Sequence, residues 1–148
     1  MNSVLFSFMY LCVLGLCDCC RCPVRPNLDL GCTSDFIFRT KVMSGLKNPN
    51  DTSGSYYQIS KPSYAYTYKF NFKSDVSAVN KARLYANAGA CDVYLTKGRI
   101  YVVSGRVDKE KQRMEIDMCS SWVETTPISS ESKRLLIKFK RGTVLCPK

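Results

Sequence analysis

The sequence contains no histidine among its 148 residues. Histidine is the usual general base, the group that most often activates serine and cysteine nucleophiles, and the commonest metal ligand. Acidic residues are also few, with 12 Asp and Glu against 22 Lys and Arg, and those present are scattered without a motif around them. The composition therefore argues against an enzyme and against a cofactor or metal of the chain's own.

Long hydrophobic runs are lacking as well, with one exception near the amino terminus. Residues Val4 to Leu16 form an apolar run of 13. This run is too short to span a bilayer, which needs about 20 residues, but it is typical of the apolar part of a secretory signal. No later segment is apolar enough to anchor the chain, so we expect a secreted protein of one domain that does not enter a membrane.

Cysteine, by contrast, is abundant, and its count restricts the cleavage site. Cleavage after Cys19 leaves six cysteines and places the small residues Cys17 and Cys19 at the −3 and −1 positions. Cleavage after Cys17, with Gly15 at −3, leaves seven. Disulfides within one chain use an even number of cysteines, which favours six, but an odd cysteine can stay free or pair with another chain, so the count leaves both sites open. A structural zinc site is a poor interpretation because the last three cysteines are isolated in the sequence.

The charge of the chain is strongly positive. Loss of residues 1–19 would remove one acid, Asp18, and no base, leaving 22 basic and 11 acidic residues and a net charge of +11. Outside the cell this charge favours polyanionic glycans or acidic proteins as partners over nucleic acid, although it could also serve solubility alone. The candidate glycan-binding residues are five cations near the carboxy terminus: Lys133, Arg134, Lys138, Lys140 and Arg141.

Alternating hydrophobicity predicts five strands. They cover Asp35 to Met43, Tyr64 to Phe72, Ala82 to Ala86, Arg99 to Ser104 and Arg113 to Met118. The intervening "GRVDKEKQ" is expected to join the last two as a hairpin. Ser44 to Ser63 is rich in Gly, Pro, Asn and Ser and is predicted to be a long exposed loop, with an N-glycosylation acceptor at Asn50.

The predicted strand at "YAYTYKFNF" carries an unusual row of aromatic residues on one face: Tyr64, Tyr66, Tyr68, Phe70 and Phe72. Such a row could stack against nucleic acid bases. More often it is the buried face of a strand, and we expect burial here.

The pattern changes to that of a helix after Pro127. Ser129 or Ser130 can cap its start, Leu135, Leu136 and Phe139 share one face, and Gly142 can end it. Five short strands followed by a helix predict a mainly β fold, a small barrel of the oligonucleotide/oligosaccharide-binding (OB) type with a carboxy-terminal helix.

The cysteine spacing resembles that of the tissue inhibitors of metalloproteinases, whose inhibitory half is a netrin-like domain. That family begins its mature chain with Cys-x-Cys, followed by a third cysteine and a Ser-Asp pair; here these are Cys20, Cys22 and "GCTSDFIFRTKV". Similar stretches are "ACDVYLTKGRIYVVSG" around the fourth cysteine and "MEIDMCSSWVETTPISSESKRLL" around the fifth. The resemblance favours cleavage after Cys19, giving a signal peptide over residues 1–19 and a netrin-like inhibitory domain over residues 20–148.

The resemblance implies a disulfide pairing and a mechanism. Of the 15 pairings that six cysteines allow, it selects Cys20–Cys91, Cys22–Cys119 and Cys32–Cys146. The α-amine and carbonyl oxygen of Cys20 would then chelate the catalytic zinc of a partner protease, which keeps one coordination position open. The expected partners are secreted or cell-surface zinc metalloproteases, and the chain itself holds no cofactor.

The family's contact residues can be carried over by position. The residue after the first cysteine enters the main specificity pocket of the protease, and its neighbours line the rest of the cleft. The corresponding set here is Cys20, Arg21, Cys22, Pro23, Val24, Ala88, Gly89 and Ala90. The family usually has Thr or Ser in place of Arg21 and Ser-Val in place of Gly89-Ala90. Vertebrate members add a second six-cysteine domain, so we expect here a single-domain, monomeric form.

Two rival functions stay open at this point. One is a netrin-like module that binds matrix glycans or signalling proteins and inhibits nothing. Arg21 favours this rival, whereas the Cys-x-Cys start favours the inhibitor. The other is a secreted oligonucleotide or glycan binder that uses the face of Tyr64, Tyr66 and Tyr68, which burial of that face would exclude. We expect the inhibitor, with heparin-like glycans as a second class of partner.

Overall fold

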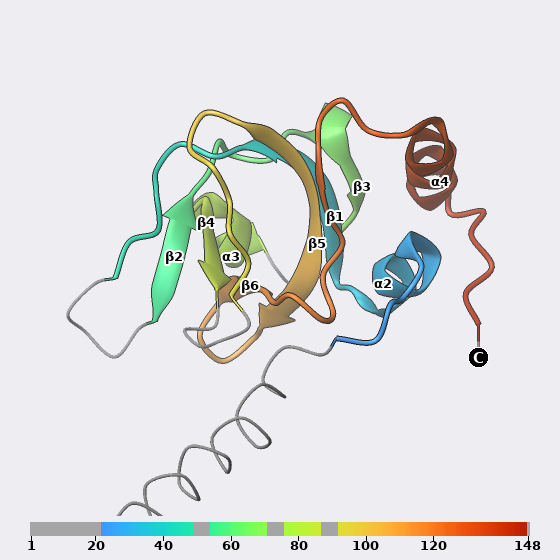
Figure 1. Ribbon diagram of the computed structural model, residues 1–148. Helices are drawn as coiled ribbons and strands as arrows, with labels where there is room; N and C mark the ends of the chain where they lie inside the picture. Colours follow the sequence, from blue (N-terminus) through green and yellow to red (C-terminus); the bar gives the residue numbers. More distant parts are fainter. Residues whose placement is uncertain (1–21, 49–53, 71–75, 87–91, 148) are drawn as a thin grey trace, which may run out of the picture.

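The computed structural model describes residues 22–48, 54–70, 76–86 and 92–147 (Figure 1). The strands are β1 Phe36–Lys41, β2 Ser55–Gln58, β3 Thr67–Lys69, β4 Arg83–Ala86, β5 Ile100–Asp108, β6 Arg113–Ile116 and β7 Val123–Thr125. The helices are α2 Asn27–Thr33, the 3₁₀-helix η2 Tyr64–Tyr66, α3 Val76–Asn80 and α4 Ser130–Arg141. The mainly β class with a carboxy-terminal helix is confirmed, with seven strands in the described ranges where five were predicted for the chain.

The strands form one curved sheet in the order β2-β4-β6-β5-β1-β3, and β7 pairs with β5. All described pairings are antiparallel except that of β4 with β6. Among the described residues, the ladder does not close into a continuous barrel. Two isolated bridges, Val42↔Ile59 and Lys47↔Tyr56, bring the chain after β1 back to β2. The predicted OB-like barrel is therefore present in a loose form.

β1 is buried on both faces, which explains its position at the centre of the molecule. Phe36, Phe38 and Val42 belong to the core enclosed by the sheet, as the alternation of the sequence predicted. Ile37 points to the opposite face and packs with Val102, Trp122 and Leu136. Figure 1 shows the strands β2, β4 and β6 on one side of β1 and β5, and the helices α2 and α4 on the other.

Helix α4 has the ends that the sequence predicted. Ser129 is its N-cap, and the Ser129 hydroxyl accepts a hydrogen bond from the Ser132 amide, an interaction worth about 1 kcal/mol. Gly142 ends the helix in the left-handed conformation at φ 68°. Leu136 is buried and packs on Ile37 across the outer face of β1. The helix lies close to α2, because a Cβ on Gly31 would stand 2.5 Å from the Phe139 ring.

A carboxylate holds the start of α4 against the sheet. Glu124 accepts hydrogen bonds from the Trp122 indole nitrogen (3.0 Å), the Ser132 hydroxyl (2.6 Å) and the Ser129 amide (2.9 Å). Burial alone would raise the pKa of Glu124, but the three hydrogen bonds together outweigh it and hold the pKa below its ordinary value. The ionised carboxylate is thus the form that fixes α4.

Two predictions about the chain between β1 and β4 are wrong. The expected loop at Ser44 to Ser63 contains β2, and its residues Tyr57 and Ile59 are buried. Of the expected strand at Tyr64 to Phe72, the described residues 64–70 form a strand only at β3, and Phe72 lies outside the described residues. Before it, η2 leaves Tyr64 79% and Tyr66 51% exposed, so the expected burial of the whole aromatic row is also wrong.

Local and distant hydrogen bonds explain the change from strand to 3₁₀-helix. The Tyr66 amide donates to the Ser63 carbonyl, which also accepts from the Thr67 hydroxyl. The Lys140 ammonium, from α4, donates to the Ala65 carbonyl at 2.7 Å. These hydrogen bonds give backbone groups of this segment partners without a neighbouring strand. The alternation of aromatic and other residues therefore did not determine its structure.

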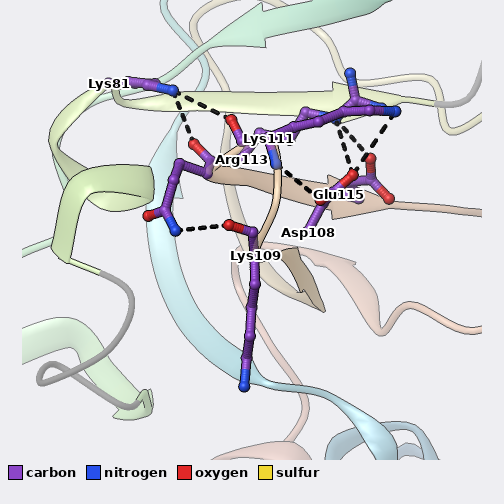
Figure 2. A network of polar contacts seen from close by, with 7 residues as sticks. Lys81, Asp108, Lys109, Lys111, Arg113 and Glu115 are labelled. Carbon is purple, nitrogen blue, oxygen red and sulfur yellow. Dashed lines mark hydrogen bonds and ion pairs between the residues drawn. The ribbon is translucent and has the colours of Figure 1, made fainter.

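The β5–β6 hairpin is confirmed, but much of "GRVDKEKQ" is strand, and the turn itself covers residues 109–112. Figure 2 shows the polar contacts around this turn. The Lys81 ammonium donates to the carbonyls of Lys111 and Gln112, and Gln112 has a positive φ of 50°. Arg113 pairs with Glu115 at 2.6 Å and with Asp108 at 4.0 Å. Lys81, Lys111 and Arg113 therefore all have local partners at this turn.

Glu124 leads to a prediction about stability in acid. Because its pKa in the folded protein lies below the ordinary value of 4.5, the ionised group stabilises the fold above that pH, and this contribution is lost as the pH falls through the folded-state pKa. Glu124→Gln should cost about 1 kcal/mol at pH 7, the lower end for a charged hydrogen-bond acceptor because the group is partly exposed. The cost of Glu124→Gln to the free energy of unfolding should shrink toward pH 3.

Urea unfolding at pH 7 and pH 3 measures this cost, and Glu110→Gln on the exposed hairpin is the control. An equal cost of Glu124→Gln at both pH values would contradict the assignment.

Candidate functional site

Only some of the predicted site residues lie within the described ranges. Cys22, Pro23 and Val24 are described, as are the five carboxy-terminal cations. The signal peptide over residues 1–19, Cys20, Arg21, Asn50 and the stretch Ala88, Gly89, Ala90 and Cys91 lie outside the described residues. The disulfide Cys20–Cys91 is therefore a prediction that this structure does not test.

Two of the three implied disulfides are confirmed. Cys22 is bonded to Cys119 with a Cα–Cα distance of 4.9 Å, and Cys32 to Cys146 with 5.6 Å, both ordinary separations. The bonds span 97 and 114 residues. In the chain-entropy account each stabilises the fold by on the order of 4–5 kcal/mol. They attach the amino-terminal segment to the sheet at one point and to the carboxy terminus at another.

The turn that carries Cys119 is held rigid by Asp117. One carboxylate oxygen accepts from the amides of Cys119 (2.9 Å) and Ser120 (2.8 Å). The other contacts the Ser120 hydroxyl, and the Ser121 hydroxyl accepts from the Asp117 amide at 3.0 Å. An aspartate that bonds the backbone two and three residues ahead is a strong turn former. Sequence analysis did not single out Asp117, although "DMCSS" contains this signal.

The Ser-Asp pair after the third cysteine has a structural role. The Asp35 carboxylate accepts from the Val107 amide at 2.9 Å, and the Asp35 amide donates to the Gly105 carbonyl at 2.8 Å. The Lys69 ammonium donates to the carbonyls of Gly31 and Cys32, both at 3.0 Å. Burial lowers the pKa of Lys69, and Asp35 partly offsets this. These bonds fix the end of α2, and with it Cys32, against β5 and β3.

Buried hydroxyl groups link the end of α2, near Cys32, to the segment that follows Cys119. The Ser34 hydroxyl lies 2.6 Å from the Leu30 carbonyl and 2.9 Å from the Ser104 hydroxyl. The Ser104 hydroxyl also accepts from the Trp122 amide at 2.7 Å, and Ser104 is fully buried. The segment that ends α2 and the turn that holds Cys119 are thus fixed to the same residue of β5.

Residues close in sequence to Cys22 and Cys119 expose apolar side chains. Val24, two residues after Cys22, is fully exposed, and Met118, next to Cys119, is 54% exposed. Tyr94 is 83% exposed and lines a hollow of about 280 Å³ together with Met118, Asp92 and Ser121. Figure 1 shows the start of the described chain beside the connection from β6 to β7. We call Cys22, Pro23, Val24, Met118 and Tyr94 the amino-terminal edge. Sequence analysis did not identify Met118 and Tyr94 as part of it.

The five candidate cations lie on α4 with exposed side chains. Arg134 and Lys138 line a cleft of about 540 Å³ with Arg25, next to the start of α2, and Glu131 also lines it. Lys140 lies on the other side of the helix, where its ammonium contacts η2. The five cations therefore share the exposed surface of α4. Arg134 and Lys138 face the cleft beside α2, whereas Lys140 faces η2.

The described part of the chain contains no group of three His, Cys, Asp or Glu side chains placed to hold a metal ion. None of its helices is long and apolar enough to cross a membrane.

The sequence profile of the UNC-6/NTR/C345C module matches residues 29–139. No individually characterised protein matches the sequence significantly. The matched range runs from α2 to α4 and includes Cys32 and Cys119, one cysteine from each described disulfide. Sheet, helix and disulfides agree with the netrin-like domain that the sequence predicted. The chain belongs to the netrin-like family of UNC-6/NTR/C345C modules.

Proposed function

We propose that this netrin-like protein is a secreted inhibitor of zinc metalloproteases that binds the protease through its amino-terminal edge. Netrin-like modules are in general binding domains without catalytic activity. The proposal concerns what this one binds. The tissue inhibitors of metalloproteinases are the netrin-like proteins whose cysteine spacing it resembles.

The observation that carries the proposal is the rigid mounting of Cys22. Its disulfide partner Cys119 stands on the turn fixed by Asp117, while Pro23 and Val24 beside it are exposed. A segment held by its backbone with its side chains free binds a cleft with little further loss of conformational entropy. The exposed Met118 and Tyr94 add apolar surface of the kind that protein interfaces bury.

The proposed chemistry needs no catalytic group on this chain. With Cys20 as the first residue, its α-amine and carbonyl oxygen would bind the zinc of the protease and displace the zinc-bound water. An α-amine has a pKa of about 8, so losing its proton to bind a metal costs little near neutral pH. Inhibition then depends on a free amine at Cys20 and on the position that the Cys22–Cys119 bond gives to it.

Blocking the amine tests this chemistry. Adding one alanine before Cys20 should weaken inhibition at least a hundredfold, because it turns the Cys20 amine into an amide nitrogen, which is a poor zinc ligand, while leaving the described core unchanged. Inhibition constants against a panel of secreted zinc metalloproteases measure the effect. The control is the same protein with one alanine added after Lys148. If the amino-terminal extension inhibits as well as this control, zinc chelation by Cys20 is wrong.

Arg21 gives a second prediction, about the range of targets. Burying an unpaired guanidinium in an apolar pocket costs several kcal/mol, or two or more orders of magnitude in binding. In a deep or acidic pocket the side chain can instead carry its charge to water or to an acid. Arg21→Thr should therefore strengthen inhibition of proteases with short apolar pockets and weaken or not change that of proteases with deep ones. If neither the parent nor Arg21→Thr inhibits any protease on such a panel, the protein is not an inhibitor.

Binding of matrix glycans is a second candidate function, favoured by the exposed cations of α4. Lys133, Arg134, Lys138 and Arg141 all have exposed side chains, and Arg25 adds a charge across the cleft. The net charge of the whole chain is +10. Charged groups spread over one accessible surface suit a long flexible polyanion better than a compact ligand.

A heparin column tests this candidate. The parent should elute at salt well above physiological, and replacing Lys133, Arg134 and Lys138 by alanine should lower the elution salt. A matched triple replacement of Lys47, Arg106 and Lys109, exposed cations elsewhere on the molecule, is the control for charge alone. Equal shifts for the two triple variants would show that net charge, not α4, determines retention.

A further inference from the structure

The two exposed tyrosines of η2 are the start of a second candidate surface. Tyr64 and Tyr66 are 79% and 51% exposed, although their neighbours Tyr68 and Phe70 pack against the core clusters. Single exposed aromatic residues are ordinary. Two on one turn, each next to a cation, are a combination that suits a binding surface.

Each of these rings holds a cation in place. The Arg39 guanidinium lies over the Tyr66 ring, 5.3 Å from its centre, and the Lys140 ammonium lies 5.6 Å from the centre of the Tyr64 ring. Lys140 is held further by its bond to the Ala65 carbonyl. Cations that are already positioned lose less side-chain entropy when an anion binds. The two tyrosine rings thus hold the charged groups of Arg39 and Lys140 in position, and both tyrosines stay exposed to a ligand.

A groove of about 190 Å³ lies beside Tyr66. It is lined by Arg39, Thr40, Lys41, Ser60, Tyr66 and Ile100. Arg39 and Lys41 leave β1 on the same face, the one that α4 covers further along the strand at Ile37. The Ser60 hydroxyl accepts from the Lys41 amide and bonds Thr40, which fixes the wall opposite. None of the described residues lining the groove is acidic.

The composition of the groove favours a sugar over a peptide. A groove for an apolar helix or strand needs an apolar floor, whereas here Ile100 is the one aliphatic side chain among the described lining residues. A sulfated sugar unit offers hydroxyl groups to polar walls, a flat C–H face to an aromatic ring, and sulfate or carboxylate oxygens that an arginine can bind in pairs. The volume lies below the range for whole drug-sized ligands, and suits one unit of a chain that continues across the surface.

We propose that this aromatic-cationic groove, made of Arg39, Lys41, Ser60, Tyr64, Tyr66 and Lys140, binds a sulfated glycosaminoglycan chain. The proposal rests on the glycan-binding candidate above and is independent of protease inhibition. It differs from a general attraction to α4 because it requires an uncharged residue, Tyr66. The chain would run from the groove past Lys140 onto α4, since Lys140 is shared by both surfaces.

The test uses a heparin hexasaccharide and isothermal titration calorimetry at several salt concentrations. Tyr66→Ala should weaken binding about fivefold or more, the effect of losing a ring contact of roughly 1 kcal/mol, without changing the salt dependence. Lys41→Ala should weaken binding and also flatten the plot of log Kd against log salt by about one. Thermal unfolding of each variant checks that the fold is retained.

Matched controls separate this groove from charge in general. Lys109→Ala removes one exposed lysine whose ammonium points away from the hairpin contacts (Figure 2). Tyr94→Ala removes one exposed tyrosine far from η2 in the sequence. Each should change affinity for the hexasaccharide less than twofold.

Three results would overturn the proposal. The hexasaccharide could fail to bind the parent, which would also end the glycan-binding candidate. It could bind the parent and Tyr66→Ala equally, which would leave α4 as a glycan surface but remove the groove. Poly-L-glutamate could bind as tightly as the hexasaccharide and lose the same factor with Tyr66→Ala, which would identify an acidic protein as the partner. Inhibition of a protease by Tyr66→Ala should equal that of the parent in every case.

Discussion

The buried hydroxyl of Ser104 is the point at which separate parts of the chain are joined. It lies in β5 with no exposed surface, and it contacts the Ser34 hydroxyl and accepts from the Trp122 amide. A buried polar group without partners costs about 1–3 kcal/mol, so these contacts must form together as the core closes. When they do, α2, β5 and the segment after the Cys119 turn take fixed positions. Both described disulfides then join segments that noncovalent bonds already hold near each other.

The second requirement is the docking of α4, which sets what the outer surface can do. The helix uses Ser132, Leu135, Leu136 and Phe139 for contacts with the body of the domain. Glu124 and the N-cap Ser129 fix its start. Since one side of the helix supplies all of these contacts, the rest of its surface is free to carry cations without loss of packing. The concentration of positive charge on α4 is therefore compatible with stability, and it does not by itself identify a ligand.

The sequence predicted those elements whose pattern and tertiary environment agree. β1 alternates because one face lines the core, and α4 has a cap, an apolar face and a terminal glycine, so local signals decided both. The disulfide pairing could not be derived from spacing, and came from the family resemblance. The turn at Asp117 was not predicted, although its signal is local: an aspartate can accept hydrogen bonds from the backbone amides two and three residues ahead.

Other errors arose because a residue far away in the sequence decided the structure. β2 was hidden by the Gly, Pro, Asn and Ser around it, and its Tyr57 is buried because its hydroxyl reaches the Val93 carbonyl at 2.9 Å. The row from Tyr64 to Phe72 predicted one buried strand. The bond from Lys140 to Ala65, 75 residues apart, and the cations over the two tyrosine rings stabilise an exposed 3₁₀ turn instead. No pattern within the segment contains that information.

The register of β1 with β5 separates the two proposed surfaces. The end at which Phe36 pairs with Gly105 adjoins Ser104 and the segment that leads from Cys119 to Trp122, and therefore the amino-terminal edge. The end at which Lys41 pairs with Ile100 lines the aromatic-cationic groove. Five residue steps along a strand correspond to about 17 Å, more than the Debye length of about 8 Å at physiological salt. A glycan in the groove would thus leave the amino-terminal edge accessible, and its charge would be largely screened there. On these two proposals, a glycan confined to the groove and a protease at the amino-terminal edge would bind independently, whereas a glycan that continued along α4 to Arg25 would approach Val24 and compete with the protease.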